Sequence, residues 1–475
     1  MGFKPDNFSE WYNNIIRTAD LADYAPVRGC MIIRPYGYAL WEGIQAFLDR
    51  RFKETGHQNA YFPLFIPESF IRKEAENFEG FAPELAIVTI GGGKELEEKL
   101  VVRPTSETII GDSFSKWIQS YRDLPMLMNQ WANVVRWELR TRPFLRTLEF
   151  LWQEGHTAHS NEPEAEEETI RMLGVYTELA LEAAAIPVIR GRKSNQEKFA
   201  GAVRSYSIEG MMGDKKALQA GTSHMLGQNF AKAFEIRYTD INNQLQYCWT
   251  TSWGLSTRFI GAIIMAHGDE KGLRLPPKLA PIQVVIVPIY KNEAEKSTVM
   301  PVVDRFAAEA KAAGVRLHID TREDKQPGFK YNDWEMRGVP VRVEIGPKDV
   351  QNNTIAVARR DVDGKAGKQF IPREGAIQAI TSLLGNIHKN LLQQATQFRD
   401  ANIHEVTSDY EKFKEILTDG WAYTWFCGSA ECEAKIKEDN QAVSRNFPLG
   451  QEKGTGPCIL CGQTATERAM FAKAY

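Results

Sequence analysis

An alternation of aromatic and charged side chains on both sides of one proline constrains the fold of this chain most. The apolar members of this pattern, within residues 136–156, are Trp137, Leu139, Phe150 and Trp152. Each has charged or polar neighbours, which is the period-two pattern of half-buried strands. Pro143 separates the two runs and indicates a loop. We therefore expect a strand, a turn and a second strand in an antiparallel sheet.

The charged residues of the same segment indicate a binding surface. They are Arg136, Glu138, Glu154 and His156, and we expect them on one face of the sheet, opposite the aromatic residues. An arginine presents a planar fork to phosphate oxygens, so this face suits a polyanion such as a triphosphate. By itself, the pattern leaves open a solvated, salt-bridged hairpin that binds nothing.

Length and composition limit the class of protein. A chain of 475 residues is too long for one compact core, and 43% hydrophobic with 25% charged residues fits a soluble globular protein. No apolar run approaches the roughly 20 residues that cross a bilayer, and the N-terminus lacks a signal-peptide core. We expect no membrane partner and a cytoplasmic location. The net charge of -3 argues against indiscriminate nucleic-acid binding but permits a specific RNA partner.

A stiff linker divides the chain. Three prolines lie within residues 275–281, and the apolar run that follows, residues 282–288, is typical of a strand buried on both faces. A helix near 295–313 and strands at 315–319 and 341–345 predict an α/β unit. Residues 375–400 predict a further helix, rich in leucine, isoleucine and glutamine.

Four cysteines close the chain in two pairs. Cys427 and Cys432 are separated by four residues, and Cys458 and Cys461 by two, which is close to the spacing of four-thiolate zinc sites. Free thiols, or disulfides in a secreted protein, are the alternatives. An intracellular location disfavours disulfides, so we expect a structural Zn²⁺ on these four thiolates.

Three motifs resemble those of class II aminoacyl-tRNA synthetases, and motif 2 is similar to that of the prolyl-tRNA synthetases. Motif 2 is matched by Arg136-x-Glu138, by Pro143-Phe-Leu-Arg-Thr147 and by Trp152-Gln-Glu-Gly-His156. Motif 3 is matched by Gly254-Leu-Ser-Thr-Arg258. A predicted helix over 37–54, followed by a proline-bearing strand over 59–67, resembles motif 1, the family's dimer-interface element. The resemblance therefore implies a homodimer.

The resemblance also implies a three-part fold. Residues 1–278 would form an α+β catalytic domain, an antiparallel sheet with flanking helices. Residues 282–385 would form an α/β anticodon-binding domain, and residues 386–475 a small α+β zinc-binding domain, as in the archaeal/eukaryotic-type branch. That branch also ends in a tyrosine that approaches the catalytic domain, here Tyr475. Residues 157–253 leave no room for the large editing insertion of many bacterial-type enzymes.

The activity implied is that of a proline–tRNA ligase, which activates L-proline with ATP and transfers it to the 3′ end of tRNA(Pro). A carboxylate that attacks a phosphate needs positive charge and Mg²⁺ more than acid–base catalysis. The resemblance assigns the catalytic roles to Arg136, at the α-phosphate, and Arg258, at the γ-phosphate of a bent ATP. The other positions that match ATP-binding residues are Glu138, Arg146, Thr147, Gln219, Thr222 and Ser256.

Proline and the anticodon have their own expected sites. The positions that match the proline pocket are Thr105, Glu107, Arg136, Trp152, Glu154, His156, Phe199 and His224. The positions that match readers of the two anticodon guanines are Glu335, Arg342, Lys348 and Asp349. Without the resemblance, Thr105-Ser-Glu107 would be an ordinary helix N-cap, the histidines would be ordinary hydrogen-bonded side chains, and the four charges would be ordinary surface residues.

Two alternatives to a proline ligase differ in chemistry. A catalytically silent paralogue that binds tRNA is expected to have lost Arg136, Arg258 or Glu107, and all three are present. A sister class II ligase for threonine, serine, glycine or histidine is the other alternative. A threonine enzyme is expected to have catalytic zinc ligands, and we find none in the catalytic half.

Overall fold

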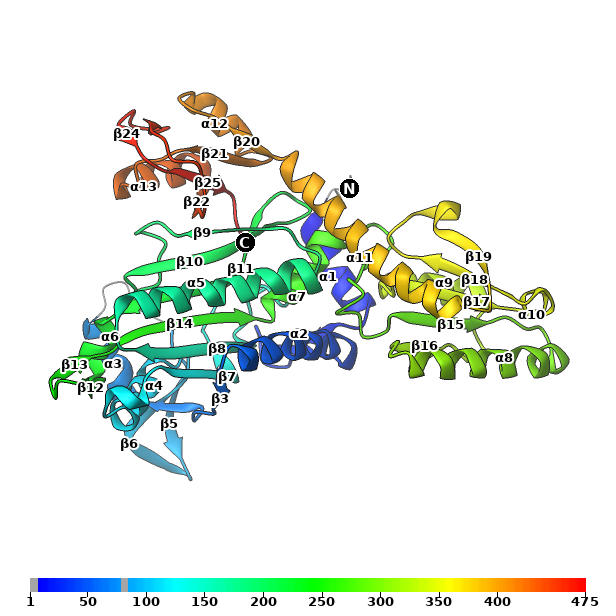
Figure 1. Ribbon diagram of the computed structural model, residues 1–475, viewed down its shortest axis with the longest axis horizontal. Helices are drawn as coiled ribbons and strands as arrows, with labels where there is room; N and C mark the ends of the chain where they lie inside the picture. The colour runs from blue at the N-terminus through cyan, green and yellow to red at the C-terminus, as the bar shows by residue number, and fades with distance from the viewer. Residues whose placement is uncertain (1–6, 78–83) are drawn as a thin grey trace.

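The computed structural model describes residues 7–475 except 78–83, so the first six residues of the predicted catalytic domain lie outside it. One large sheet dominates the fold (Figure 1). Its eleven strands run in the order β20-β21-β25-β22-β9-β10-β11-β14-β8-β7-β3. The seven that belong to the first part of the chain are β3 (Gln58–Asn59), β7 (Met126–Val135), β8 (Glu149–His159), β9 (Val188–Arg192), β10 (Arg204–Met211), β11 (Ala217–Gly227) and β14 (Trp249–Ser256). Within this sheet the neighbouring strands in the order β9-β10-β11-β14-β8-β7 are antiparallel, as expected. β3 pairs with β7 in parallel.

One face of this sheet packs against a helix. α5 (Glu162–Glu178) begins at Asn161, whose side chain accepts a hydrogen bond from the backbone N–H of Glu164. Figure 1 shows α5 lying along β10, β11 and β14, where Ser223 Oγ donates to the backbone oxygen of Thr169 at 2.7 Å. Gly155 is required on this face, because a Cβ there would lie 2.1 Å from the ring of Trp253. The opposite face is left open for other contacts.

Two further helices complete the main core. α2 (Pro35–Glu54) confirms the helix predicted over 37–54, and Leu40, Ile44 and Leu48 are fully buried on one of its faces. α7 (Arg258–His267) is buried from Phe259 to its end, and only its first residue reaches the open face of the sheet. A helix without a polar side can be stable only inside a core.

Smaller elements surround this core, and together with it they form what we call the central unit. They are α1 (Phe8–Thr18), β1 (Ala22–Tyr24), β2 (Met31–Ile33), β4 (Phe65–Pro67), α3 (Glu68–Asn77), β5 (Ile87–Gly91), β6 (Lys94–Val102), α4 (Glu107–Trp117), η1 (Tyr121–Asp123), the π-helical turn η2 (Leu179–Ala183), α6 (Asn229–Phe234), β12 (Arg237–Thr239) and β13 (Leu245–Tyr247). β4, β5 and β6 form a separate small sheet.

The α/β unit follows the proline-rich linker. Its sheet has the order β16-β15-β17-β18-β19, and β15 is parallel to both of its neighbours. Its elements are β15 (Val284–Pro288), α8 (Glu293–Ala312), β16 (Leu317–Ile319), α9 (Pro327–Met336), β17 (Val341–Ile345), α10 (Pro347–Asn352), β18 (Thr354–Arg359), η3 (Gly364–Gly367) and β19 (Lys368–Pro372). Every residue of β15 is buried, which confirms the strand predicted from the apolar run.

A long helix connects this unit to the end of the chain. α11 (Ala376–Asp400) confirms the predicted helix and runs obliquely from the α/β unit to the C-terminal unit (Figure 1). The C-terminal unit contains β20 (Ile403–Glu405), α12 (Tyr410–Ile416), β21 (Trp421–Trp425), α13 (Ala430–Asn440), β22 (Val443–Pro448), β23 (Gly456–Pro457), β24 (Thr464–Ala465) and β25 (Arg468–Ala472). None of the helices in the described ranges is long and apolar enough to cross a membrane.

The C-terminal unit shares the main sheet with the central unit. β22 pairs antiparallel with β9, placing Phe447 opposite Arg192 and Pro448 opposite Gly191. A Cβ at Gly191 would lie 2.5 Å from the backbone oxygen of Phe447, so only glycine permits this approach. Tyr475 also reaches the central unit, where its hydroxyl donates to Asp214 at 2.6 Å.

Two details of the predicted hairpin are wrong. The first strand ends at Val135, so Trp137 and Leu139 lie in the following loop and are exposed rather than half-buried. The strand is instead β7, Met126–Val135, because the apolar residues that fit a strand lie there, before Arg136. The aromatic and charged residues of β8 also share one face, since Phe150, Trp152, Glu154 and His156 all line the same cavity. Residues two apart on a strand point to the same side.

Candidate active site

A cavity of about 500 Å³ opens on the face of the main sheet that α5 does not cover. It is floored by β8, β11 and β14 and bordered by residues 104–107 and 193–200. The predicted residues that line it are Thr105, Glu107, Arg136, Trp152, Glu154, His156, Phe199, Gln219, Thr222, His224, Ser256 and Arg258. The structure therefore brings most of the predicted substrate-binding positions into one site, although they come from distant parts of the chain.

Arg136 lies directly after β7, where the backbone and two rings fix its side chain. Its Nε donates to the backbone oxygen of Pro104 at 3.0 Å, and its guanidinium lies 5.6 Å from the ring centre of Phe150 and 5.3 Å from that of Trp152. Burial lowers the pKa of Arg136, while the nearby carboxylates of Glu107, Glu154 and Glu138 act in the opposite direction. The guanidinium stays charged at neutral pH, so it presents a fixed cation to the cavity.

Arg258 is the first residue of α7 and supplies a second cation. Its Nε donates to the backbone oxygen of Leu145 at 3.0 Å, and its backbone N–H donates to Ser256 Oγ at 3.2 Å. Burial, followed by repulsion from Arg136 and Arg146, lowers the pKa of Arg258 to about 10. Two arginines that repel each other in one cavity favour an anion between them.

A buried carboxylate network lies below Arg136. Glu154 accepts hydrogen bonds from Ser106 Oγ at 2.5 Å and from Gln130 Nε2 at 2.9 Å, and its other oxygen lies 3.0 Å from His156 Nε2. Burial raises the pKa of Glu154, but these hydrogen bonds outweigh it and the pKa is lowered. Burial acts against the charged form of His156, but Glu154 and Glu107 raise its pKa overall. Both pKa shifts favour an ion pair between Glu154 and His156.

The segment Thr105-Ser-Glu107 both begins a helix and faces the cavity. Ser106 stands at the N-cap of α4, but its hydroxyl bonds to Glu154 rather than to the helix backbone. Thr105 Oγ1 donates to Glu107, and both side chains line the cavity. The alternative of an ordinary helix N-cap therefore holds for the backbone position of Ser106 but not for its side chain.

An imidazole and an aromatic ring form one wall. The rings of Phe199 and His224 are stacked with their centres 4.8 Å apart, and His224 Nδ1 lies 2.8 Å from Ser205 Oγ. Burial, then the positive charges of Lys193 and His156, lowers the pKa of His224 to about 3. His224 is therefore neutral at physiological pH and contributes an uncharged wall.

Three predicted ATP-binding residues do not line this cavity. Glu138 and Arg146 lie on the loop that follows β7, where Arg146 Nη1 is 3.8 Å from Glu138 Oε2. Thr147 is buried and its hydroxyl donates to the backbone oxygen of Glu149 at 2.7 Å, so it supports the loop. For Thr147, the side chain is already occupied within the protein.

Sequence reasoning missed one cation of the site. Lys193 lines the cavity directly after β9, and its Nζ donates to Gln219 Oε1 at 2.7 Å. Burial lowers the pKa of Lys193. The local sequence Gly191-Arg-Lys-Ser194 carries no pattern that separates this lysine from surface lysines.

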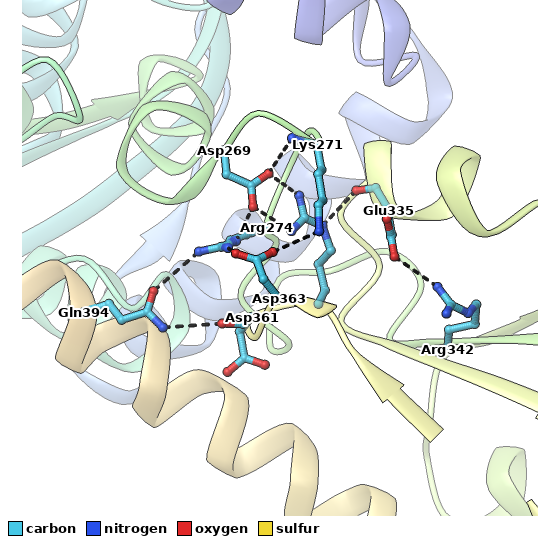
Figure 2. Close-up of polar contacts among 9 residues, drawn as sticks. Asp269, Lys271, Arg274, Glu335, Arg342, Asp361, Asp363 and Gln394 are labelled. Atoms are coloured by element: carbon cyan, nitrogen blue, oxygen red, sulfur yellow. Dashed lines mark hydrogen bonds and ion pairs between the residues drawn. The ribbon is translucent and has the colours of Figure 1, made fainter. Parts of the chain in front are cut away.

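A second cavity, of about 300 Å³, lies in the α/β unit and holds two of the four predicted anticodon readers. Glu335 and Arg342 line it, with Arg342 Nη1 3.3 Å from Glu335 Oε1 (Figure 2). Lys348 is exposed on α10 and does not line this cavity. Asp349 also lies on α10 and accepts a hydrogen bond from the backbone N–H of Gly346 at 2.9 Å.

The same region joins the α/β unit to the end of α7. Asp269, two residues beyond α7, accepts a hydrogen bond from Arg360 Nη1 at 2.8 Å and lies 2.7 Å from Arg274 Nε (Figure 2). Arg360 Nε also donates to the backbone oxygen of Glu335 at 3.0 Å. Arg360 and Asp269 therefore link Glu335, a candidate anticodon reader, to the end of α7, the helix that carries Arg258.

The four terminal cysteines converge as predicted. The sulfurs of Cys427, Cys432, Cys458 and Cys461 all lie within 4.8 Å of one another, and all four thiols are free of disulfides. A tetrahedral site with Zn–S bonds of about 2.3 Å has sulfurs about 3.8 Å apart. The arrangement fits a four-thiolate metal site and leaves no protein ligand missing.

Comparison with known proteins was consistent along the whole chain. Residues 88–267 match the model of the tRNA synthetase class II core domain (G, H, P, S and T), residues 283–383 an anticodon binding domain, and residues 410–475 the prolyl-tRNA synthetase C-terminal domain. A proline–tRNA ligase of Roseiflexus castenholzii is 56% identical over 474 residues, covering 99% of this chain and 98% of the relative.

Two further relatives show the same similarity. The chloroplastic/mitochondrial proline–tRNA ligase of Arabidopsis thaliana is 56% identical over 476 residues, covering 99% of this chain and 88% of the relative. The proline–tRNA ligase of Symbiobacterium thermophilum is 54% identical over 478 residues, covering 99% of this chain and 97% of the relative.

Proposed function

This chain belongs to the prolyl-tRNA synthetase family, and from this premise we propose that it is the ATP-dependent ligase that charges tRNA(Pro) with proline. The reaction has two steps. L-proline and ATP give prolyl-adenylate and pyrophosphate, and the proline is then transferred to the 3′ end of the tRNA. The observation that carries the proposal is the convergence of Arg136 and Arg258 on one cavity whose other walls suit a small imino acid.

ATP occupies the part of the cavity between the two arginines. Arg136 would contact the α-phosphate and the proline carboxylate, and Arg258 the γ-phosphate, so that a bent triphosphate spans both cations. Mg²⁺, when bound, supplies further positive charge to the phosphate oxygens. Gln219, Thr222 and Ser256 also line the cavity and remain predicted contacts of the nucleotide. Glu138, Arg146 and Thr147 remain predicted contacts on the loop.

Proline occupies the part of the cavity beside Glu107. Its secondary ammonium has two hydrogens, and Glu107 with Thr105 offers a carboxylate and a hydroxyl for them. Trp152, Phe199 and the neutral His224 provide an apolar wall for the ring. The Glu154–His156 pair holds the floor of the pocket in place.

The tRNA anticodon would bind at the second cavity. Guanine N–H groups can donate to Glu335, and Arg342 can donate to guanine oxygen and nitrogen acceptors. Lys348 and Asp349 lie at the start of α10, directly after β17, and remain predicted readers.

We propose that the protein does not edit in cis. The proposal is supported by the shortness of residues 160–248, between β8 and β14, which form α5, η2, β9 to β11, α6 and the separate two-stranded sheet of β12 and β13. Rapid deacylation of alanyl-tRNA(Pro) by the pure protein would contradict this.

Three further parts of the proposal concern metal, assembly and location. The four cysteines would hold a structural Zn²⁺. Motif 1, predicted as a helix over 37–54 and a strand over 59–67, would form a homodimer interface. The structure has α2 in the first range but only the ends of the second range in strands, β3 and β4. A cytoplasmic location stays a prediction, and the Arabidopsis relative is named as chloroplastic/mitochondrial.

Amino-acid-dependent ATP–pyrophosphate exchange tests the proposed function. The wild-type protein should exchange pyrophosphate into ATP with proline, and only weakly with threonine, serine, glycine or histidine. A preference for one of those amino acids would assign a sister ligase. No exchange with any of them, combined with tRNA binding, would assign a silent paralogue.

A further inference from the structure

A buried ion pair crosses from the C-terminal unit to the strand beneath the ATP side of the cavity. Arg445, on β22, donates from Nε at 3.0 Å and from Nη2 at 2.8 Å to the same oxygen of Glu209 on β10. The two residues are 6% and 0% exposed. Glu209 pairs in register with Gln219 of β11, so the carboxylate lies beside a residue that lines the cavity.

The same unit also approaches Lys193 from a second side. Glu433 follows Cys432 on α13, and its Oε1 accepts a hydrogen bond from Ser194 Oγ at 3.0 Å. Lys193, adjacent to Ser194, donates to Gln219 at 2.7 Å. The pairing of β22 with β9 brings these groups together, because Lys193 is the first residue after β9.

The charge of Glu209 acts on the cations of the cavity. Burial lowers the pKa of Lys193. The charge of Glu209 raises the pKa values of both Lys193 and Arg258, and the charge of Arg445 lowers both. Among the described residues, Glu209 Oε1 has no hydrogen-bond partner. A buried carboxylate with a free oxygen attracts any mobile cation within reach unless another charge offsets it.

We propose that Arg445 is a positioning residue for the ATP side of the cavity. By neutralising Glu209, it leaves Lys193 bonded to Gln219 and leaves Arg258 directed at the phosphates. Without it, Glu209 would compete with the nucleotide for these cations. The C-terminal unit would thus contribute to adenylate formation, although none of the residues that line the cavity in the described chain belongs to it. This inference rests on the proposed assignment of the cavity to ATP.

Separate KM values for ATP and proline in the exchange reaction test the inference. R445Q retains a hydrogen-bond donor but removes the charge, and should raise the KM for ATP about tenfold, as expected for the loss of a charged interaction. The KM for proline should stay within about twofold, because the proline side does not contact this pair. R445K, which keeps the charge, and R445Q/E209Q, which leaves neither charge unpaired, should bring the KM for ATP back to within about threefold of wild type.

K215M is the matched control. Lys215 Nζ lies 2.6 Å from Asp419 Oδ2, so this pair crosses between the same two units at the protein surface. Its loss should leave both KM values unchanged. Circular dichroism establishes that each variant is folded, and if R445Q is not, R445K and the double variant carry the comparison.

Three results would overturn the inference. They are an unchanged KM for ATP in folded R445Q, a parallel rise of both KM values, or a double variant no better than R445Q. Where R445Q does not fold, a KM for ATP raised about tenfold in R445K or in the double variant would overturn it equally. Absence of proline-dependent exchange in the wild-type protein would instead refute the proposed function, and with it the ATP assignment on which this inference rests.

Discussion

Arg136 shows how a single residue can be prepared for a charged substrate. Its guanidinium is held by the backbone oxygen of Pro104 and lies near the rings of Phe150 and Trp152. These contacts orient the planar group without neutralising it, since an aromatic face and a carbonyl oxygen carry no net charge. The carboxylates of Glu107, Glu154 and Glu138 offset part of the cost of holding this cation out of water, and a bound anion would offset more of it.

Glu107 should determine proline affinity. E107Q removes the charge that faces the secondary ammonium and should raise the KM for proline by about 10- to 100-fold, as expected for a hydrogen bond to a charged group worth about 1.5–3 kcal/mol. The KM for ATP should change little, and steady-state exchange kinetics measure both.

Asp112 offers a control on the same helix. It pairs with Lys116 at the surface of α4 at 2.7 Å, and D112N should alter neither KM because exposed pairs contribute little. A KM for proline in E107Q that equals the value in D112N would refute the role of Glu107.

At the residue scale, the sequence was informative where a motif existed. The positions that match motifs 2 and 3 include Arg136 and Arg258, and the structure places both in one cavity. Lys193 lies in the same cavity but in no recognisable pattern, because its position depends on where β9 ends against β22. Thr147 matches the motif but lies outside the cavity, where its hydroxyl donates to the backbone oxygen of Glu149, so its contact with ATP stays a prediction.

At the element scale, the junction of β9 with β22 depends on one glycine. G191A would place a methyl group 2.5 Å from the backbone oxygen of Phe447 and should destabilise the protein by about 1–3 kcal/mol, as overpacking commonly does. Thermal unfolding and limited proteolysis of the C-terminal unit measure this effect.

Gly174 provides the contrasting substitution. It lies within α5 with no atom within 4 Å of its Cβ position, so G174A should be neutral or stabilising by up to about 1 kcal/mol. Equal unfolding temperatures for G191A and G174A would contradict the close approach of the two strands.

The C-terminal end of α7 should make stability depend on pH. Burial lowers the pKa of His267 to about 4, while its Nε2 lies 2.8 Å from the backbone oxygen of Ala184. Between pH 4 and about 6.5 the unfolded chain binds a proton that the folded protein does not, so stability falls as the pH falls through this window. From pH 7.5 to 5.5 the loss due to His267 should be about 1 kcal/mol.

H267Q should remove that contribution. Urea unfolding at pH 7.5 and 5.5 should show a smaller loss of stability on acidification in H267Q than in wild type, and H404Q, at an exposed residue of β20, should behave like wild type. An identical pH dependence in wild type and H267Q would contradict a buried, neutral histidine.

Helices and fully buried strands were easier to predict from the sequence than β7, the first strand of the hairpin. β15 and α11 have long apolar patterns that fix their type, and both were confirmed. The first strand of the hairpin was misplaced because Trp137 and Leu139 alternate with charges on an exposed loop, and alternation does not distinguish a loop from a strand edge. Tertiary pairing of β7 with β8 decides the boundary.

At the scale of the whole molecule, the metal cluster should stabilise the C-terminal unit. We expect about one Zn²⁺ per chain by elemental analysis, because four thiolates complete a structural site. C427S and C461S should lose the metal and make the C-terminal unit sensitive to protease. C30S, outside the cluster, should retain it, and a protein that is free of metal yet equally resistant would contradict the assignment.

The arrangement of the three units could not be predicted from the sequence. The proline linker and the change of pattern after it indicated separate units, but nothing local to Phe447 indicated that β22 would extend the main sheet. The salt bridge between Asp269 and Arg360 joins residues 91 apart in sequence, and charges so distant carry no pairing signal.

Adenylate formation in R136A and R258A tests the central claim most directly, with both variants checked for native circular dichroism. Removal of either cation should lower proline-dependent ATP–pyrophosphate exchange by at least about 100-fold, a loss of about 2.7 kcal/mol of transition-state stabilisation. K116A, at the exposed end of α4, should exchange at the wild-type rate. Exchange at the wild-type rate in either arginine variant would contradict the convergence of the two guanidinium groups on one nucleotide.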